Sequence, residues 1–361
     1  MFDPDGLMVA SYRVLVVDDM ATNRMLLRAA LQSDDYAVTE AADGEQALAL
    51  LAGDESFDVV LLDVNLPGLN GFEVCRRIRA SHDMRLLPVI MLTTLEDPTD
   101  VVAGMQAGAS DYLIKPFQAI ELKARLAAAA EHKRLIDRLD EAEAVLFALA
   151  RMVEAKDETT GDHCDRLAHT GVVFGRALGL SYEELEALRR GGVLHDIGKL
   201  GIPDSILCKK GPLDAAEWKI MKQHNAIGAA LCSPLKTMRR TADIVLCHHE
   251  KWNGAGYPAG LAGDEIPLLA RVFQIVDIYD ALSSDRPYKP AWPREKIIAT
   301  MQAETEKGFW DPRLTKVFLD ILKTQPEVLT LSTGTKLKQD QRIFQEIEQS
   351  GALAWSQGGN G

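Results

Sequence analysis

Short apolar runs alternate with helix-periodic stretches through residues 11–118, and this alternation constrains the fold more than any other feature of the chain. Apolar runs of this length, separated by stretches with helical spacing, predict parallel strands joined by helices. We therefore expect a doubly wound α/β domain over residues 1–118, with a parallel five-stranded sheet and helices on both faces. The clearest strand candidates are Val14–Val17, Val59–Leu62, Val89–Leu92 and Tyr112–Ile114.

Residues 119–156 contain no glycine or proline and predict one long linker helix. From Ala128 to Val153 its apolar positions follow steps of four and three, a heptad pattern interrupted by His132. One interpretation is a coiled coil that pairs two chains as a homodimer. The other is that the stripe packs on its own domain, most readily in its C-terminal half.

Residues 157–325 have helical patterns almost throughout and predict a second, all-α domain. Residues 326–361 are polar and are expected to form a C-terminal helix and a flexible tail. Three helix-start signals precede residues that are candidate metal ligands. They are Ser181 before a helix towards His195, Asp214 before a helix that carries His224, and Pro267 before a helix that carries Asp277.

The balance of charges excludes some classes of partner. With 40 basic and 53 acidic residues the net charge is −13, which disfavours nucleic acids and membrane surfaces because both are anionic. No apolar run approaches the roughly 18–20 residues that cross a bilayer. The five cysteines form no CxxC pair, which predicts reduced thiols. We therefore expect a cytoplasmic protein.

Polar side chains follow successive strands of the first domain. Asp18 and Asp19 follow the first strand, Asp63 ends the third, Thr93 ends the fourth, and Lys115 follows the fifth. The carboxyl ends of parallel strands meet in one crevice, so we expect these groups to gather there. Clustered carboxylates suit Mg²⁺, and the cation with the lysine would neutralise a phosphoryl group on Asp63.

Over residues 12–125 the chain resembles the receiver domain of bacterial response regulators, through VLVVDD, LLDVNLPGLNGFE, MLTT and DYLIKPF. The resemblance implies that Asp63 is the phosphoacceptor. It also implies that Asp18, Asp19 and the backbone carbonyl of Asn65 hold Mg²⁺, and that Tyr112 is the switch aromatic. A sensor histidine kinase is the partner that this family implies.

A second group of polar residues is spread along the α-helical region. Imidazoles and carboxylates without sulfur favour Fe, Mn, Zn, Co or Ni, and so many ligands exceed the capacity of one ion. Two ions that share Asp196 would satisfy them and would suit phosphodiester hydrolysis, with Lys199 assisting the leaving group. The seven candidate ligands are His163, His195, Asp196, His224, His248, His249 and Asp277.

Over residues 145–325 the chain resembles the HD-GYP phosphodiesterase family, through TTGDHCDR, LHDIGKLGIPD, GPLDAAEWKIMKQH, CHHEKWNGAGYPAGLAGDEIP and IVDIYDALSSDRPYK. The resemblance implies hydrolysis of cyclic di-GMP to pGpG and in some members to GMP, with iron or manganese favoured. It implies Lys199 as the catalytic lysine, with GGDEF-type proteins as further partners. The first metal's ligands would be His163, His195, Asp196 and Asp277; the second's would be His224, His248, His249 and the bridging Asp196.

Contacts to the nucleotide are expected beyond the metals. The resemblance implies that Asp280, Arg286 and Lys289 hold guanine edges or the second phosphate. Tyr257 and Trp252 are candidates for stacking on a base. The alternative is that the charges are solvated at a helix end and the aromatic rings pack the glycine-rich loop.

The number of metals rests on one position. Some family members hold a third metal through a glutamate four residues before the first histidine. Thr159 stands at that position, and Glu158 lies one residue away, which turns it about 100° around a helix. We therefore expect two metals.

The sequence thus predicts a response regulator that hydrolyses cyclic di-GMP under the control of Asp63 phosphorylation. A rival within enzymes is the hydrolase of another cyclic dinucleotide, such as the mixed GMP–AMP cycle. A rival from another class is a module that responds to cyclic di-GMP without turnover.

Overall fold

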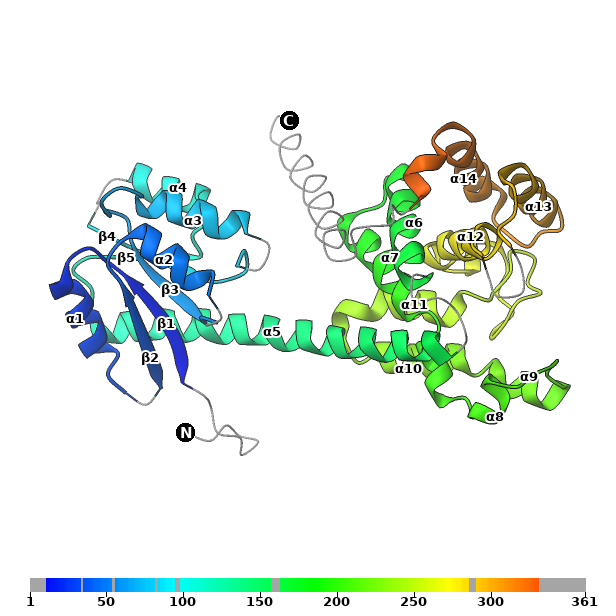
Figure 1. The fold of residues 1–361 in the computed structure, drawn as a ribbon, viewed down its shortest axis with the longest axis horizontal. Coiled ribbons are helices and arrows are strands. Elements are labelled where there is room, and N and C mark those ends of the chain that lie inside the picture. Colours follow the sequence, from blue (N-terminus) through cyan, green and yellow to red (C-terminus); the bar gives the residue numbers. More distant parts are fainter. Residues whose placement is uncertain are drawn as a thin grey trace. The chain divides into compact units, whose positions relative to one another are not determined.

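The computed structural model describes residues 11–33, 35–53, 56–81, 84–94, 98–156, 163–285 and 290–330. The chain divides into two compact units, residues 1–142 and 143–361, each of which is described by itself (Figure 1). Among the residues described, we find no helix with the length and apolar character that a membrane span requires.

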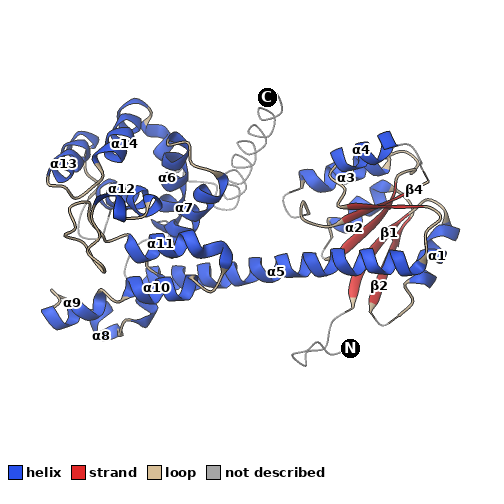
Figure 2. Ribbon diagram, turned by 180° about the vertical axis from the view of Figure 1, so that it is seen from behind, coloured by secondary structure: helices blue, strands red, loops and turns tan. Residues whose placement is uncertain are grey.

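The first unit is built on a parallel sheet with the strand order β2-β1-β3-β4-β5 (Figure 2). This confirms the predicted fold class, and each of the four apolar runs forms a strand. The edge strand β2 was not located from the sequence. The strands are β1 (Tyr12–Val17), β2 (Tyr36–Ala41), β3 (Val59–Asp63), β4 (Val89–Thr93) and β5 (Asp111–Ile114).

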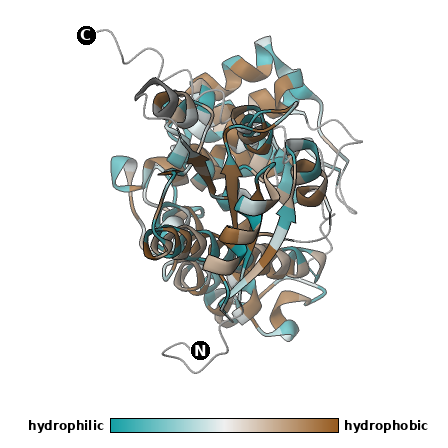
Figure 3. Ribbon diagram, turned by 90° about the vertical axis from the view of Figure 1, so that its left-hand side faces the viewer, coloured by the Kyte–Doolittle hydropathy of each residue, from teal (hydrophilic) through white to brown (hydrophobic). Residues whose placement is uncertain are grey.

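Helices cover both faces of this sheet because alternate strand residues point to opposite sides. Leu15 and Val17 belong to the core under α2 and α3, whereas Val14 and Val16 belong to the core under α1 and α5. Figure 3 shows the strongly apolar colouring of the central strands. The helices are α1 (Ala21–Ala30), α2 (Gly44–Leu51), α3 (Gly71–Ala80), α4 (Pro98–Gln106) and the first part of α5 (Ala119–Lys156).

The helix α5 has the predicted bounds, and its apolar stripe has three parts. Leu122 and Leu126 are buried in the core of the first unit. Val153 is buried in a core of the second unit, so the C-terminal part packs on its own domain. Between them, Leu135 and Leu139 are 51% and 46% exposed.

The second unit is α-helical, as predicted. Its largest core includes Phe174 and Phe318, whose ring centroids are 5.0 Å apart. Its helices are the end of α5, α6 (His163–Ala177), α7 (Tyr182–Leu194), α8 (Asp204–Leu207), α9 (Ala215–Met221), α10 (His224–Cys232), α11 (Arg239–Cys247), α12 (Leu268–Ser283), α13 (Arg294–Glu306) and α14 (Pro312–Thr324), with a 3-10 helix η1 (Ile197–Gly201).

The predicted helix starts are present, with one correction. Ser181 and Asp214 each form a capping box with the glutamate three residues later. The helix that Asp214 opens does not carry His224, because α9 ends at Met221 and His224 begins α10. The amide of Gln223 bonds to the carbonyl three residues back, at 2.9 Å, and this tight turn ends α9.

Candidate functional sites

The receiver site lies at the carboxyl ends of β1, β3 and β5. The ammonium Nζ of Lys115 is 2.8 Å from Asp18 Oδ2 and 2.9 Å from Asp63 Oδ2. Asp18, Asp19 and Asp63 each offer an oxygen within 4.8 Å of the others, an arrangement able to hold a hard cation. The predicted residues therefore gather in one crevice.

Burial and the lysine set the charge state of this site. Burial raises the pKa of Asp63 despite its bonds to Lys115. Burial also opposes ionisation of Asp18, but Lys115 and the amide of Met20 outweigh it, so the pKa of Asp18 lies below its usual value. The bonds to both carboxylates likewise outweigh burial at Lys115 and raise the pKa of its ammonium.

Of the remaining receiver residues, Asn65 contacts the aspartate crevice, and Thr93 and Tyr112 line a separate small cavity. The amide of Asn65 donates to Asp63 Oδ1 at 3.3 Å. Thr93 and Tyr112 line one small cavity between β4, β5 and α4. The sequence analysis missed Asn23, whose amide nitrogen donates to both oxygens of Asp18 at 3.0 Å. Asn23 lies in the first turn of α1, and only the structure shows that it faces Asp18.

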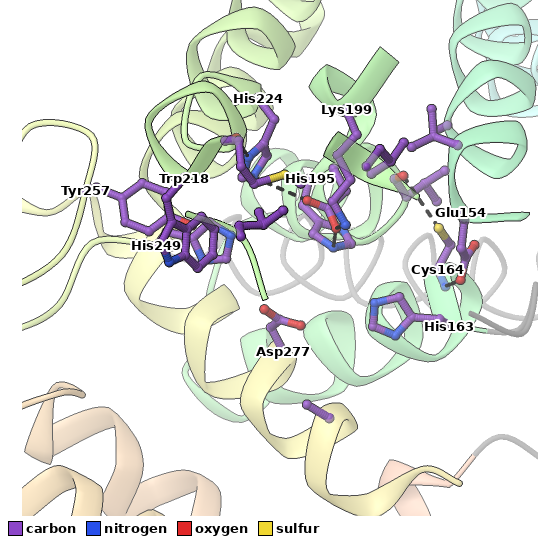
Figure 4. Close-up of a pocket in the computed structure, with 18 residues that line it drawn as sticks. Glu154, His163, Cys164, His195, Lys199, Trp218, His224, His249, Tyr257 and Asp277 are labelled. Atoms are coloured by element: carbon purple, nitrogen blue, oxygen red, sulfur yellow. Dashed lines mark hydrogen bonds and ion pairs between the residues drawn. The ribbon is translucent and has the colours of Figure 1, made fainter. Parts of the chain in front are cut away.

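The second site collects residues from helix ends that are far apart in the sequence. His163 begins α6, His195 and Asp196 lie between α7 and η1, and His224 begins α10. Figure 4 shows His163, His195 and His224 around one space, with Asp277 reaching in from α12. All seven predicted ligands fall into two adjoining sets, within each of which the ligand atoms lie within 4.8 Å of one another. The sets are His163, His195 and Asp277; and Asp196, His224, His248 and His249.

Asp196 lies between the two sets. Its Oδ2 is 3.3 Å from Nε2 of His195, a member of the first set. Its Oδ1 is 3.4 Å from Nε2 of His224 and 3.9 Å from Nε2 of His248, both members of the second. Each carboxylate oxygen thus faces a different group of imidazoles, which is the geometry that a bridging ligand needs.

The imidazoles are oriented for metal binding. His195, His224 and His248 each place Nδ1 on a backbone carbonyl, at 3.2, 2.7 and 2.9 Å respectively. A proton on Nδ1 leaves the Nε2 lone pair for a cation. Nε2 of His224 and of His248 is buried and has no hydrogen-bond partner among the described residues. Orphaned buried nitrogens of this kind fit a bound metal.

Electrostatics also favour the ligand forms of Asp196, His248 and His249. At His195, by contrast, burial is outweighed by the Asp196 carboxylate, which raises the pKa of this imidazole. Burial opposes the charge of Asp196, but Lys199 and His195 outweigh it and hold the pKa of this carboxyl well below its usual value. The Lys199 ammonium lies 3.0 Å from Asp196 Oδ2. Burial lowers the pKa of His249 to about 4 and the pKa of His248 well below its usual value, so both rings are neutral near pH 7.

A glycine allows η1 to approach α10. A Cβ at Gly198 would lie 1.8 Å from the carbonyl oxygen of His224 and 2.5 Å from the nitrogen of Gly228. Gly198 lies between Asp196 and Lys199 in the sequence, and only a glycine at this position leaves room for the start of α10. This close packing places Asp196 against His224.

The residues proposed to contact the nucleotide are distributed differently. Tyr257 lines the cavity of 410 Å³ that contains the ligand sets. Trp252 packs under the guanidinium of Arg313, 5.2 Å from its ring centroid, and is not part of the cavity lining. Trp218, which the sequence analysis missed, does line it. Arg286, Lys289, Glu158 and Thr159 lie outside the described residues.

Asp280 occupies a position behind the ligands. It is 4% exposed, and its Oδ2 is 2.6 Å from Nδ1 of His163. Arg166 donates to both of its oxygens, at 2.6 and 3.1 Å. These contacts favour a carboxylate that orients His163 over one that reads a guanine edge.

Comparison with known proteins agrees with this geometry. The response regulator receiver domain family matches residues 14–127, and the HD domain family matches residues 148–314. The cyclic di-GMP phosphodiesterase response regulator RpfG of Xanthomonas campestris is 35% identical over 329 residues, covering 85% of this chain and 86% of that protein. A cyclic di-GMP phosphodiesterase of Thermotoga maritima is 32% identical and covers 87% of this chain and 92% of that protein.

A narrower match concerns the second unit. The 3'3'-cGAMP-specific phosphodiesterase 2 of Vibrio cholerae is 37% identical over 188 residues, which are 52% of this chain and 36% of that protein. A receiver domain followed by an HD domain defines the class of response regulators with an HD output domain. Within this class, the chain belongs to the family of cyclic di-GMP phosphodiesterase response regulators.

Proposed function

We propose that this response regulator hydrolyses cyclic di-GMP to pGpG at a dinuclear metal centre in its HD domain, with GMP as the candidate product of a second cleavage. The main support for this proposal is the position of Asp196 between two groups of imidazoles. The names of the full-length relatives support the substrate.

Each residue of the site has a separate task in this proposal. The five histidines and Asp277 would hold two cations, and Asp196 would be the ligand common to both. When bound, the cations supply Lewis acidity to the phosphodiester and to the attacking water. Lys199 is close enough to Asp196 to lie beside the reacting phosphate, where its ammonium stabilises the charge on the leaving oxygen or protonates it.

The donor set supports iron or manganese as the native metals, with nickel, zinc or cobalt able to use the same atoms. The carboxylates of the receiver site support Mg²⁺ there. Anaerobic purification followed by elemental analysis tests both the identity and the number of the metals. Two transition metals per chain are expected; three would contradict the dinuclear assignment.

Product chromatography tests the reaction itself. Full-length protein reconstituted with Fe²⁺ or Mn²⁺ is expected to convert cyclic di-GMP to pGpG, and a second cleavage would give GMP. Faster hydrolysis of the mixed GMP–AMP cycle would favour the second candidate function, which the cGAMP-specific relative supports. Binding of cyclic di-GMP without hydrolysis under every metal would instead indicate a non-catalytic module.

We further propose that phosphorylation of Asp63 by a sensor histidine kinase regulates the HD domain through α5. The exposed Leu135 and Leu139 support pairing of two chains along the middle of this helix. Turnover by wild-type protein with a small phosphodonor, compared with Asp63→Asn, tests the regulation. Equal rates under all conditions would refute it, and a Leu135→Glu variant that sediments as wild type would refute the pairing.

A further inference from the structure

One wall of the cavity is apolar, in contrast with the metal-ligating wall. It is formed by α8, α9 and the segment that joins them, and it comprises Leu207, Leu213, Trp218 and Met221. A phosphate is bound by cations and hydrogen-bond donors and gains nothing from such a wall. The apolar wall therefore indicates that the ligand also has a flat, weakly polar part.

Trp218 is the aromatic residue that is available on this wall. Its side chain is 48% exposed although it lines the cavity, and no ring or cation of the described residues stacks on it. Tyr257 is already in contact with His249, with the ring centroids 4.8 Å apart. Trp252 carries Arg313 on its ring. Figure 4 shows Trp218 and Tyr257 on the His249 side of the site.

The backbone under Trp218 is held by the start of α9. The Asp214 carboxylate accepts bonds from the amides of Ala216 and Glu217, at 2.8 and 2.9 Å. Lys209 Nζ bonds to both oxygens of Glu217, at 2.7 and 2.5 Å. The amide of Trp218 donates to the Asp214 carbonyl at 2.9 Å. A ring on a backbone that is fixed in advance loses less entropy when a ligand binds.

We propose that Trp218 stacks on one purine base of the substrate, with Leu207, Leu213 and Met221 bordering the same base. The inference rests on the proposed cyclic dinucleotide substrate. Stacking does not distinguish guanine from adenine, because every base has a π-face. Trp218 therefore strengthens binding of cyclic di-GMP and of the mixed GMP–AMP cycle alike.

Steady-state kinetics of the metal-loaded, full-length protein test the role of the ring. Trp218→Ala is expected to raise KM for cyclic di-GMP about 5- to 100-fold, the range that base–aromatic stacking supplies. The value of kcat is expected to stay within about twofold, because the stack is equal in the ground and transition states. Trp218→Phe retains an aromatic face and should recover most of the loss. The control Lys219→Ala, an exposed residue of α9 outside the cavity lining, should match wild type.

Tryptophan fluorescence gives a readout that a merely structural role would not move. Stacking on guanine quenches indole emission, so stopped-flow mixing of wild type with cyclic di-GMP should show a rapid decrease that Trp218→Phe lacks. An unchanged KM in Trp218→Ala and unchanged quenching in Trp218→Phe would overturn the stacking and leave the hydrolase proposal intact. Quenching that depends on Trp218 without hydrolysis would retain the stacking and refute the hydrolase. Neither quenching nor hydrolysis in the wild type would refute both.

Discussion

Each of the two sites places a lysine against an aspartate, but the surroundings differ. In the receiver, Lys115 lies between Asp18 and Asp63, at 2.8 and 2.9 Å, and its ammonium balances carboxylates. In the HD domain, Lys199 lies 3.0 Å from Asp196, whose other neighbours are imidazole nitrogens. The same pair of residues therefore belongs to two kinds of site.

The difference lies in the donor atoms and in how they are held. The receiver offers only carboxylate oxygens, which suit a hard cation such as Mg²⁺ that keeps several of its water ligands. The HD site offers neutral imidazoles whose Nδ1 atoms are fixed on backbone carbonyls, an arrangement that retains softer metals. We infer that the receiver lysine serves as a counter-charge to carboxylates, whereas in the HD site bound cations would balance Asp196 and would leave Lys199 available for the role proposed above.

The largest effect is expected from Asp196→Asn. A neutral amide removes the charge shared by the two ligand sets, so both metals bind less tightly and the phosphodiester loses their combined activation. We expect hydrolysis to fall about 10⁴-fold or more, together with metal content. Product chromatography and elemental analysis check this. Asp320→Asn, an exposed residue of α14, is the control, and a variant with full metal content and near-normal rate would contradict the bridging role.

Lys199→Met is expected to lower the rate of hydrolysis without lowering the metal content of the protein. Removing the ammonium should lower kcat about 10²- to 10³-fold, the effect of losing one acid or electrostatic group. Metal content should stay at the wild-type value, because no imidazole is disturbed. The measurement is single-turnover hydrolysis beside elemental analysis, with Lys236→Met as the control. Loss of metal in parallel with activity would show that Lys199 holds the metal ligands in place instead of taking part in the chemistry.

The sequence identified all seven residues that the structure gathers into the two sets, because the chemistry restricts the residue types. Adjacent His-Asp and His-His pairs at helix ends are rare without a metal, and strand-end carboxylates meet wherever parallel strands align. The strand β2 was not located because it is an edge strand of which only Ala41 is buried, so its apolar signal is weak.

Other features depend on packing that no local pattern records. Asp280 follows Asp277 by three residues, which predicts one shared helix face. In the structure both lie beside His163 of α6, but Asp277 lines the cavity whereas Asp280 is bound to His163 Nδ1 and does not line it. Trp218 lies in the GPLDAAEWKIMKQH stretch that resembles the family, but that stretch gives the residue no role, and only the cavity lining does.

Asp280→Asn sharpens the comparison further, because among the candidate metal ligands it alters the support of His163 alone, although it also weakens the pair with Arg166. The amide keeps one acceptor but loses the charge that holds His163 at 2.6 Å. We expect the affinity of the first metal to fall about 10- to 100-fold, as for other residues that orient a ligand. Titration of apoprotein with Mn²⁺ measures it. Asp264→Asn, which removes an exposed carboxylate that pairs with Arg313, is the matched control.

A guanine-binding role for Asp280 predicts a different outcome. If this carboxylate contacted the nucleotide, Asp280→Asn would raise KM for cyclic di-GMP and leave the metal titration unchanged. The orienting role predicts weaker metal binding at any substrate concentration, with KM restored when metal is saturating.

Lys115→Met has the smallest expected effect and the opposite sign. Its ammonium occupies Oδ2 of both Asp18 and Asp63, so its removal frees two oxygens and deletes a positive charge beside a divalent ion. A unit charge about 6 Å from Mg²⁺ contributes roughly 1.4 kcal/mol even in bulk water, so Mg²⁺ should bind about tenfold more tightly. Calorimetric titration of protein already loaded with transition metals measures this, with Lys133→Met in α5 as the control. Weaker Mg²⁺ binding would show that the receiver lysine orients the carboxylates rather than competing with the cation, and the contrast between the two lysines would then disappear.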